Sequence, residues 1–129
     1  MLPSETALLY NFSGTESGRK LKAVLLKMRV KIKVVTPESY LEPVGFLAGI
    51  KGIPSKETVY DGGNFPGQML VLRGFTGSRL NLLLAELRKQ KLAIPLKAVI
   101  TEHNMFWDSL KLYGELIQEH EAMNQADPN

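Results

Sequence analysis

The sequence contains two short apolar segments that each lead through a hydroxyl residue and a glycine into an amphipathic stretch. Residues 8–12 end at Ser13 and Gly14, and residues 70–75 end at Thr76 and Gly77. Short apolar runs bounded by turn residues are typical of buried strands. The stretch after each run places apolar residues at i, i+3, i+4 and i+7, which is one face of a helix. These positions are Leu21, Val24, Leu25 and Met28 in one case, and Leu80, Leu83, Leu84 and Leu87 in the other.

A second predicted strand follows each of these helices, at residues 32–36 and 96–101, and both strands end on threonine. A further helical segment comes next, at residues 40–50 in the first case and at about residues 105–123 in the second. Asn104 stands where the N-cap of the last helix is expected. The same order of elements, strand–helix–strand–helix, is therefore predicted twice.

This alternation favours a sheet of mostly parallel strands with helices on both faces. We expect an α/β fold with a small four-stranded sheet, built from two βαβα halves related by a pseudo-repeat. The preferred strand order is 2-1-3-4, with right-handed crossovers. A ferredoxin-like α+β arrangement is the alternative.

The length of 129 residues suits one domain. Within it we expect a first half at residues 1–50, a glycine-rich connecting loop at 51–67, a second half at 68–123 and a frayed tail at 124–129. Val59 and Tyr60 are candidates for a short extra strand in the loop, which is long enough to be functional.

Composition excludes several kinds of chemistry. The chain has no cysteine, so disulfides, thiolate metal sites and cysteine nucleophiles are ruled out, and a reducing cytoplasm is expected. The beginning does not resemble a secretory signal, and no apolar run is long enough to span a membrane.

Positive charge is concentrated between Glu16 and Glu38, where no acid occurs. Arg29, Lys31 and Lys33 alternate with valine and isoleucine, which is the pattern of a strand with one buried face. Lysines on such a strand favour an edge protected against pairing with other chains. Nucleic acid is not favoured as a partner, because the sequence offers no aromatic stacking platform nearby.

Part of the sequence resembles a known bacterial family. The residues that carry the resemblance are the run 69–75 (MLVLRGF), the leucine-rich helix after it, the run 95–101 (PLKAVIT), Asn104 and Trp107. They are similar to the bacterial domain of unknown function catalogued as number 3783. Residues 43–49 are similar to the segment that usually precedes that domain. The resemblance implies an uncharacterised bacterial protein and supplies no catalytic residues.

The best candidate ligand site is at the ends of the first and third strands. Helix N-termini attract anions, and ligands of open parallel sheets bind beyond the carboxyl ends of the strands. If both strands end at one edge, a crevice for a small anion would be lined by polar loop residues, which are Asn11, Ser13, Gly14, Arg73, Thr76, Gly77 and Arg79.

The loop at residues 13–20 is not a nucleotide-binding P-loop, because its glycine spacing and the residue after Lys20 do not match. Thr15 or Ser17 is expected to cap the helix instead.

A second polar group follows the last predicted strand. His103 and Asn104 are candidate ligand-binding residues, with His103 suited to proton transfer. Trp107 and Phe46 are candidate interface residues. Two histidines are too few for a metal site on any recognisable scaffold, so no metal and no cofactor are expected.

No convincing catalytic constellation is present, and the sequence favours a non-enzymatic binding or protein-interaction module, with a homodimer or another protein as the possible partner. The alternative is a small enzyme or a sensor that binds an anionic metabolite.

Overall fold

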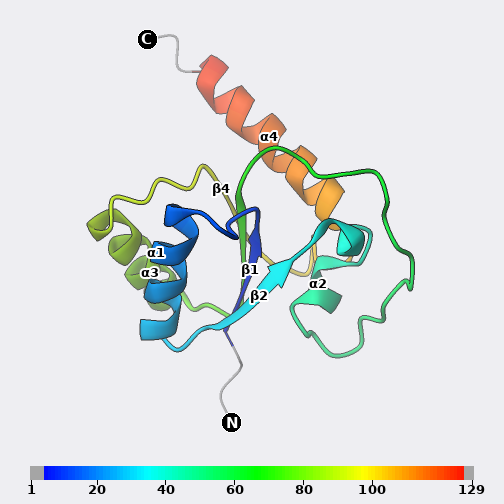
Figure 1. The fold of residues 1–129 in the computed structure, drawn as a ribbon, viewed down its shortest axis with the longest axis horizontal. Coiled ribbons are helices and arrows are strands. Elements are labelled where there is room, and N and C mark those ends of the chain that lie inside the picture. Colours follow the sequence, from blue (N-terminus) through cyan, green and yellow to red (C-terminus); the bar gives the residue numbers. More distant parts are fainter. Residues whose placement is uncertain (1–4, 127–129) are drawn as a thin grey trace.

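The computed structural model describes residues 5–126, which form one mixed four-stranded sheet with helices on both faces (Figure 1). The elements, in chain order, are β1 (Thr6–Tyr10), α1 (Glu16–Lys27), β2 (Lys31–Val35), a 3-10 turn (Pro37–Ser39), α2 (Val44–Leu47), β3 (Met69–Arg73), α3 (Gly77–Lys89), β4 (Leu96–Val99) and α4 (Ser109–Ala126). The strand order is β2-β1-β3-β4, as the sequence predicts. The ferredoxin-like alternative is wrong, because β1 and β2 pair directly and in parallel.

The direction of the strands divides the sheet into two parallel pairs. β1 pairs in parallel with β2, and β3 pairs in parallel with β4. The central pair, β1 and β3, is antiparallel, with Thr6 opposite Arg73 and Tyr10 opposite Met69. The second half therefore runs in the opposite direction to the first.

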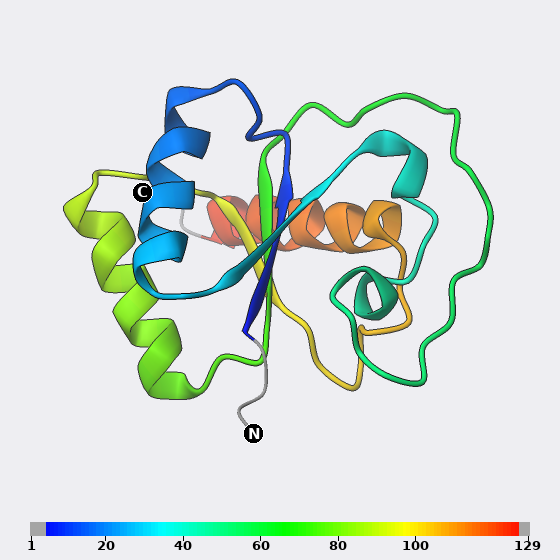
Figure 2. The same ribbon diagram turned by 60° about the horizontal axis from the view of Figure 1, so that its bottom comes forward.

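Each face of the sheet has its own apolar core. α1 and α3 pack side by side on one face, where Leu21, Leu25 and Leu83 are fully buried (Figure 2). α2 and α4 cover the other face, and their core includes the buried residues Tyr10 and Tyr40. Burial on both faces explains why β1 and β3 are continuous apolar runs.

Hydroxyl side chains cap the first turns of α1, where the sequence predicts a cap at Thr15 or Ser17, and of α3. The Thr15 Oγ1 accepts a hydrogen bond of 2.9 Å from the Gly18 N–H, and Thr76 Oγ1 accepts one of 3.3 Å from the Arg79 N–H. These contacts satisfy N–H groups that a helix leaves unpaired in its first turn.

Three predicted elements differ from the structure. The helix expected at residues 40–50 is reduced to the four-residue α2, because Pro43 precedes α2 and Gly49, with φ of 81°, follows it. No strand forms at Val59 and Tyr60 within residues 5–126, and Tyr60 stacks on Tyr40 instead. The last helix begins at Ser109 rather than near Met105, and its backbone continues to Ala126. Of the expected tail, residues 127–129 lie outside the described residues.

Candidate functional site

The residues predicted to line one crevice lie at opposite ends of the two central strands, β1 and β3. Asn11, Ser13 and Gly14 follow the end of β1, which lies beside the start of β3. Arg73, Thr76, Gly77 and Arg79 lie at or after the end of β3, beside the start of β1. The prediction of a shared anion crevice is therefore wrong. The prediction fails because the long connection between α2 and β3 returns the chain to the side of the sheet where β1 ends. β3 starts there and runs antiparallel to β1.

Just after the end of β1, Asn11 forms hydrogen bonds with the glycine-rich connection between α2 and β3. Its Nδ2 donates to the carbonyls of Phe65 and Gly67, at 3.0 and 2.7 Å, and its Oδ1 accepts from Asn64 Nδ2. The backbone of Asn11 has φ of 68°, a conformation that asparagine tolerates better than most residues. Both amide donors are used within the chain, so Asn11 has a structural role.

Ser13 and Gly14 are exposed beside a shallow hollow at the start of α1. Arg19 and Lys22 line this hollow, but so does Glu16, whose carboxylate lies 3.7 Å from Arg19 Nη2. A carboxylate at this position already supplies the negative charge that the helix N-terminus favours. The hollow therefore lacks the features of a built anion site.

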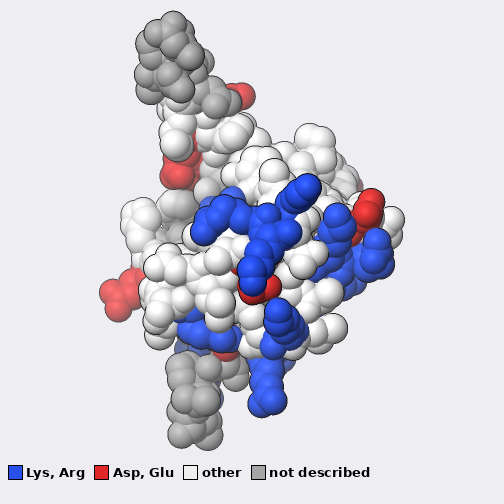
Figure 3. Space-filling model, turned by 90° about the vertical axis from the view of Figure 1, so that its left-hand side faces the viewer, with Lys and Arg blue, Asp and Glu red and all other residues white. Residues whose placement is uncertain are grey.

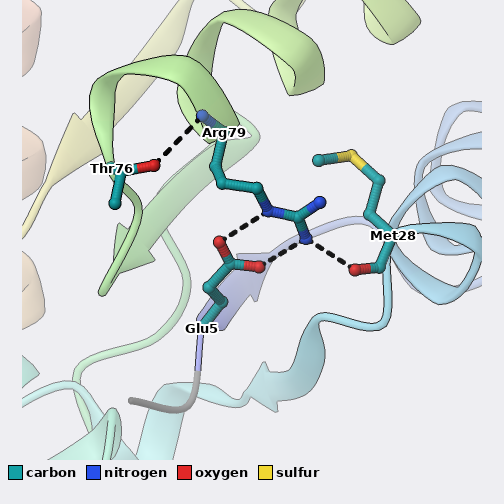
Figure 4. Close-up of polar contacts among 4 residues, drawn as sticks. All are labelled: Glu5, Met28, Thr76 and Arg79. Atoms are coloured by element: carbon teal, nitrogen blue, oxygen red, sulfur yellow. Dashed lines mark hydrogen bonds and ion pairs between the residues drawn. The ribbon is translucent and has the colours of Figure 1, made fainter. Parts of the chain in front are cut away.

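Beyond the end of β3, Arg79 links three parts of the chain, which are the start of α3, the end of α1 and the residue before β1 (Figure 4). Its Nε and Nη2 donate to the two carboxylate oxygens of Glu5, at 2.9 and 2.6 Å, and Nη2 also donates to the Met28 carbonyl at 2.6 Å. The hydrogen bond to Glu5 raises the pKa of Arg79. Met28 caps the C-terminus of α1, where a cation is favourable. The guanidinium is thus engaged before any ligand arrives.

The loop after β4 folds back on the strand through Asn104. The Asn104 Oδ1 accepts from the Thr101 N–H at 2.9 Å, and its Nδ2 donates to the Val99 carbonyl at 3.2 Å. A neighbouring strand would make the same two kinds of contact, so Asn104 closes this end of the sheet edge. Its predicted role as N-cap of the last helix is wrong, because Asp108 Oδ1 accepts from the Lys111 N–H at 2.8 Å.

Trp107 and His103 contact each other in this loop rather than presenting a site. Their rings meet edge to face with centroids 5.2 Å apart, and Lys111 Nζ lies 4.7 Å from the centre of the indole ring. Trp107 is partly buried against the core beneath α4, and its carbonyl accepts from the Val44 N–H. Phe46, also predicted as an interface residue, is 37% exposed. Exposed hydrophobic residues that occur singly are common on protein surfaces.

A cluster of aromatic side chains joins the connection to the core beneath α4. Tyr40 stacks on Phe65 with centroids 4.7 Å apart, and Phe65 stacks on Tyr113 at 3.9 Å. Tyr10 is fully buried beside them, and its hydroxyl is 2.6 Å from Ser109 Oγ. Burial raises the pKa of both Tyr10 and Tyr40. The cluster fixes the connection in place, because each of these rings packs on its neighbours.

Among residues 5–126 no three His, Asp or Glu side chains come close enough to hold a metal ion. The pKa of Glu38 is lowered mainly by the hydrogen bond from the Thr36 hydroxyl, at an exposed turn. No helix in the described range has the length and apolar character needed to cross a membrane.

The outer edge of β4 presents hydrogen-bonding groups that the sequence predictions did not include. Ile100 N–H donates to the Leu72 carbonyl at 2.8 Å, so Ile100 faces β3. Because residues of a strand alternate in direction, the backbone groups of Lys97 and Val99 point away from β3. The Val99 carbonyl is occupied by Asn104. Within residues 5–126 no hydrogen bond uses the N–H groups of Lys97 and Val99 or the Lys97 carbonyl, so these groups are open along this edge.

Two apolar hollows lie beside that open edge, on the side of α3. One, of about 180 Å³, is lined by side chains that include Leu72, Leu80 and Val99. The other, of about 330 Å³, is lined by Leu87, Arg88, Leu92, Ile94 and Pro95, among others. Leu84 and Lys97 line both hollows. We call these two hollows, together with the outer edge of β4, the β4 groove.

Sequence reasoning missed the β4 groove because Leu80 and Leu84 belong to the apolar stripe of α3, which was assigned to the core as a whole. In the structure both residues are only partly buried, whereas Leu83 in the same stripe is fully buried. One signal was present. The strand that contains Lys97 has a single lysine, whereas the strand at the other edge contains Lys31 and Lys33.

Basic side chains gather on the side of the molecule formed by α1 and α3 (Figure 3). Glu86 is nearly buried there and lies 3.5 Å from both Lys27 Nζ and Lys89 Nζ. Arg88 and Lys97 lie on the part of this side that borders the β4 groove, and neither has an acidic partner within residues 5–126.

Residues 68–123 match the family model described as a domain of unknown function, DUF3783. No curated protein and no solved structure matches the chain. The matched region contains β3, α3, β4 and most of α4, and therefore includes the whole β4 groove.

Proposed function

We propose that this chain is a non-enzymatic protein-interaction module that binds an extended segment of another protein along the β4 groove. The observation that carries the proposal is the row of open backbone groups at Lys97 and Val99 beside two apolar hollows. Addition of a strand to a sheet edge is a recurrent mode of peptide recognition, in which the backbone provides affinity and flanking pockets provide specificity.

The two edges of the sheet differ in their suitability for this role. β2 exposes Lys31 and Lys33, and charged residues on an edge strand discourage pairing with other chains. β4 has one lysine, and the remaining surface on its α3 side is mainly aliphatic. The edge of β4 is also short, because Asn104 closes one end and Pro95 lies at the other. Such an edge suits a short peptide segment.

Binding is favoured over catalysis by the state of the polar residues. The side chains first considered for a ligand site, Asn11, Arg79 and Asn104, make their hydrogen bonds within the protein. None of the described groups with shifted pKa values, which are Tyr10, Glu38, Tyr40 and Arg79, lines the β4 groove. We further propose that the module acts in the bacterial cytoplasm, in keeping with the family resemblance and the lack of cysteine, and that its two halves derive from one duplicated unit.

The test immobilises the intact chain and selects peptides that bind it from a displayed library of linear seven-residue peptides. Val99→Pro removes an outward N–H without removing a bond to β3, and Val34→Pro is the matched control at the outer edge of β2. We expect enriched peptides to bind the wild type and the Val34→Pro variant, and to lose at least tenfold in affinity for Val99→Pro.

A side-chain variant protects the test against misfolding of the proline variants. Leu80→Glu places a charge in the smaller hollow, and Leu26→Glu is its control on the exposed face of α1, where Leu26 is 68% exposed. Peptides that bind all variants equally, or a library that yields no peptide, would overturn the proposal.

A further inference from the structure

We infer that the segment bound in the β4 groove carries an acidic residue opposite Lys97 and apolar residues two positions before and after it. This inference rests on the proposed function and specifies the partner. It follows from the order of apolar and basic surfaces along the groove.

The groove consists of two apolar hollows that meet at Leu84 and Lys97, and we call this boundary the saddle. Leu84 and Lys97 belong to both hollows and therefore form the boundary between them. Along a bound strand, alternate side chains point to the same face and lie about 7 Å apart. A residue at the saddle thus places its neighbours at plus and minus two positions over the two hollows.

The charges at the saddle are not neutralised within residues 5–126. Lys97 Nζ donates to the Ile94 carbonyl, which uses one of its three donors and holds the amine beside the groove. Arg88 lines the larger hollow and is exposed. Lys27 and Lys89, by contrast, share Glu86. A carboxylate opposite Lys97 would find a cation on the facing strand and a second one on α3.

A second copy of the chain fits this edge less well. Antiparallel pairing of two β4 strands through the open groups of Lys97 places Lys97 opposite Lys97, and like charges directly opposite each other are destabilising. Pairing centred on Ala98 instead requires the Val99 carbonyl, which already accepts from Asn104. The open groups and the charge therefore favour an acidic peptide over self-association.

The experiment measures binding of blocked seven-residue peptides to the intact chain by NMR titration. The reference peptide has glutamate at its centre, leucine two positions on either side and threonine elsewhere. Replacement of the glutamate by lysine should weaken binding to the wild type about fivefold, because a cross-strand attraction becomes a repulsion. Replacement of both leucines by threonine should weaken it at least as much. The Lys97→Glu variant should prefer the lysine peptide, whereas the control variant Lys31→Glu should keep the wild-type preference.

The results separate this inference from the proposed function. If library peptides bind in a Val99-dependent manner but the reference peptides show no charge preference, or Lys97→Glu does not reverse it, the inference fails and the interaction module stands. If the chain sediments as a dimer that Val99→Pro dissociates, the edge belongs to a second copy and the acidic segment is excluded. If no peptide binds in a Val99-dependent manner, the proposed function fails as well.

Discussion

Arg79 on α3 holds Glu5, the residue before β1, through two parallel hydrogen bonds and at the same time donates to the end of α1. Glu5 is only 15% exposed in its side chain, so its carboxylate depends on this partner. The contact links three elements where β3 ends beside the start of β1, a position at which the sequence had suggested a ligand site.

Replacement of Arg79 by methionine should lower the midpoint of urea unfolding, because it leaves a largely buried carboxylate without its donors. The double variant Glu5→Leu/Arg79→Met should recover part of the loss, since neither polar partner is then left unpaired. Arg73→Met is the matched control, because the Arg73 side chain makes no hydrogen bond or ion pair with the described residues. Equal midpoints for Arg79→Met and Arg73→Met would contradict the structural role of the pair.

The close approach of α1 to the end of β1 depends on Gly18. A Cβ atom at this position would lie 2.0 Å from the Phe12 carbonyl oxygen, which is far inside van der Waals contact. Gly18→Ala should therefore reduce the free energy of unfolding by about 1–3 kcal/mol, as overpacking does in other cores. Gly114→Ala in the interior of α4 meets open space and should raise it by about 0.5–1 kcal/mol. Chemical denaturation of both variants measures the difference, and a neutral Gly18→Ala would show that the helix can move away.

The sequence predicted the strand order but not the relative direction of the two halves. An apolar run such as residues 69–72 is buried on both faces, and it has the same pattern whichever way the strand runs. The direction of β3 is set by the path of the residues between α2 and β3, and that path depends on contacts such as Asn11 with Phe65 and Gly67, which lie 54 and 56 positions apart. The candidate site failed for this reason, although its residues were placed on the correct loops.

The start of α4 shows a similar limit. Asn104 and Asp108 are both good N-cap residues, and local preference does not distinguish them. Long-range contacts decide between them, since the Ser109 N–H donates to the Tyr40 carbonyl and the Val44 N–H donates to Trp107. These contacts hold residues 105–108 against α2 in a non-helical form and leave Asn104 free to close the edge of β4.

The connection before β3 should loosen when Asn11 loses its side chain. Asn11→Gly keeps a residue that tolerates positive φ, so it isolates the loss of the side-chain hydrogen bonds to Asn64, Phe65 and Gly67. We expect a loss of about 1–3 kcal/mol in the free energy of unfolding, together with faster amide exchange in residues 64–68. Asn81→Gly on the exposed face of α3 is the control, and it should leave exchange in the connection unchanged. Unaltered exchange in Asn11→Gly would mean that the stacked aromatic rings alone hold the connection.

Tyr10 should make the protein sensitive to alkali. Burial raises the pKa of Tyr10 above the ordinary value of 10.0, so the folded state keeps this proton at a pH where the unfolded chain releases it. The unfolded state then binds fewer protons, and stability is retained below about pH 10 but falls above it, by at most about 1.4 kcal/mol per pH unit for one such group. Tyr10→Phe should lose about 1 kcal/mol at pH 8, where its hydrogen bond to Ser109 is missing, but should show a shallower decline between pH 10 and 11. Tyr60→Phe is the control, because the Tyr60 hydroxyl makes no hydrogen bond to the described residues. Urea unfolding of the three proteins across this pH range measures the slopes, and parallel slopes for wild type and Tyr10→Phe would show that Tyr10 ionises without unfolding.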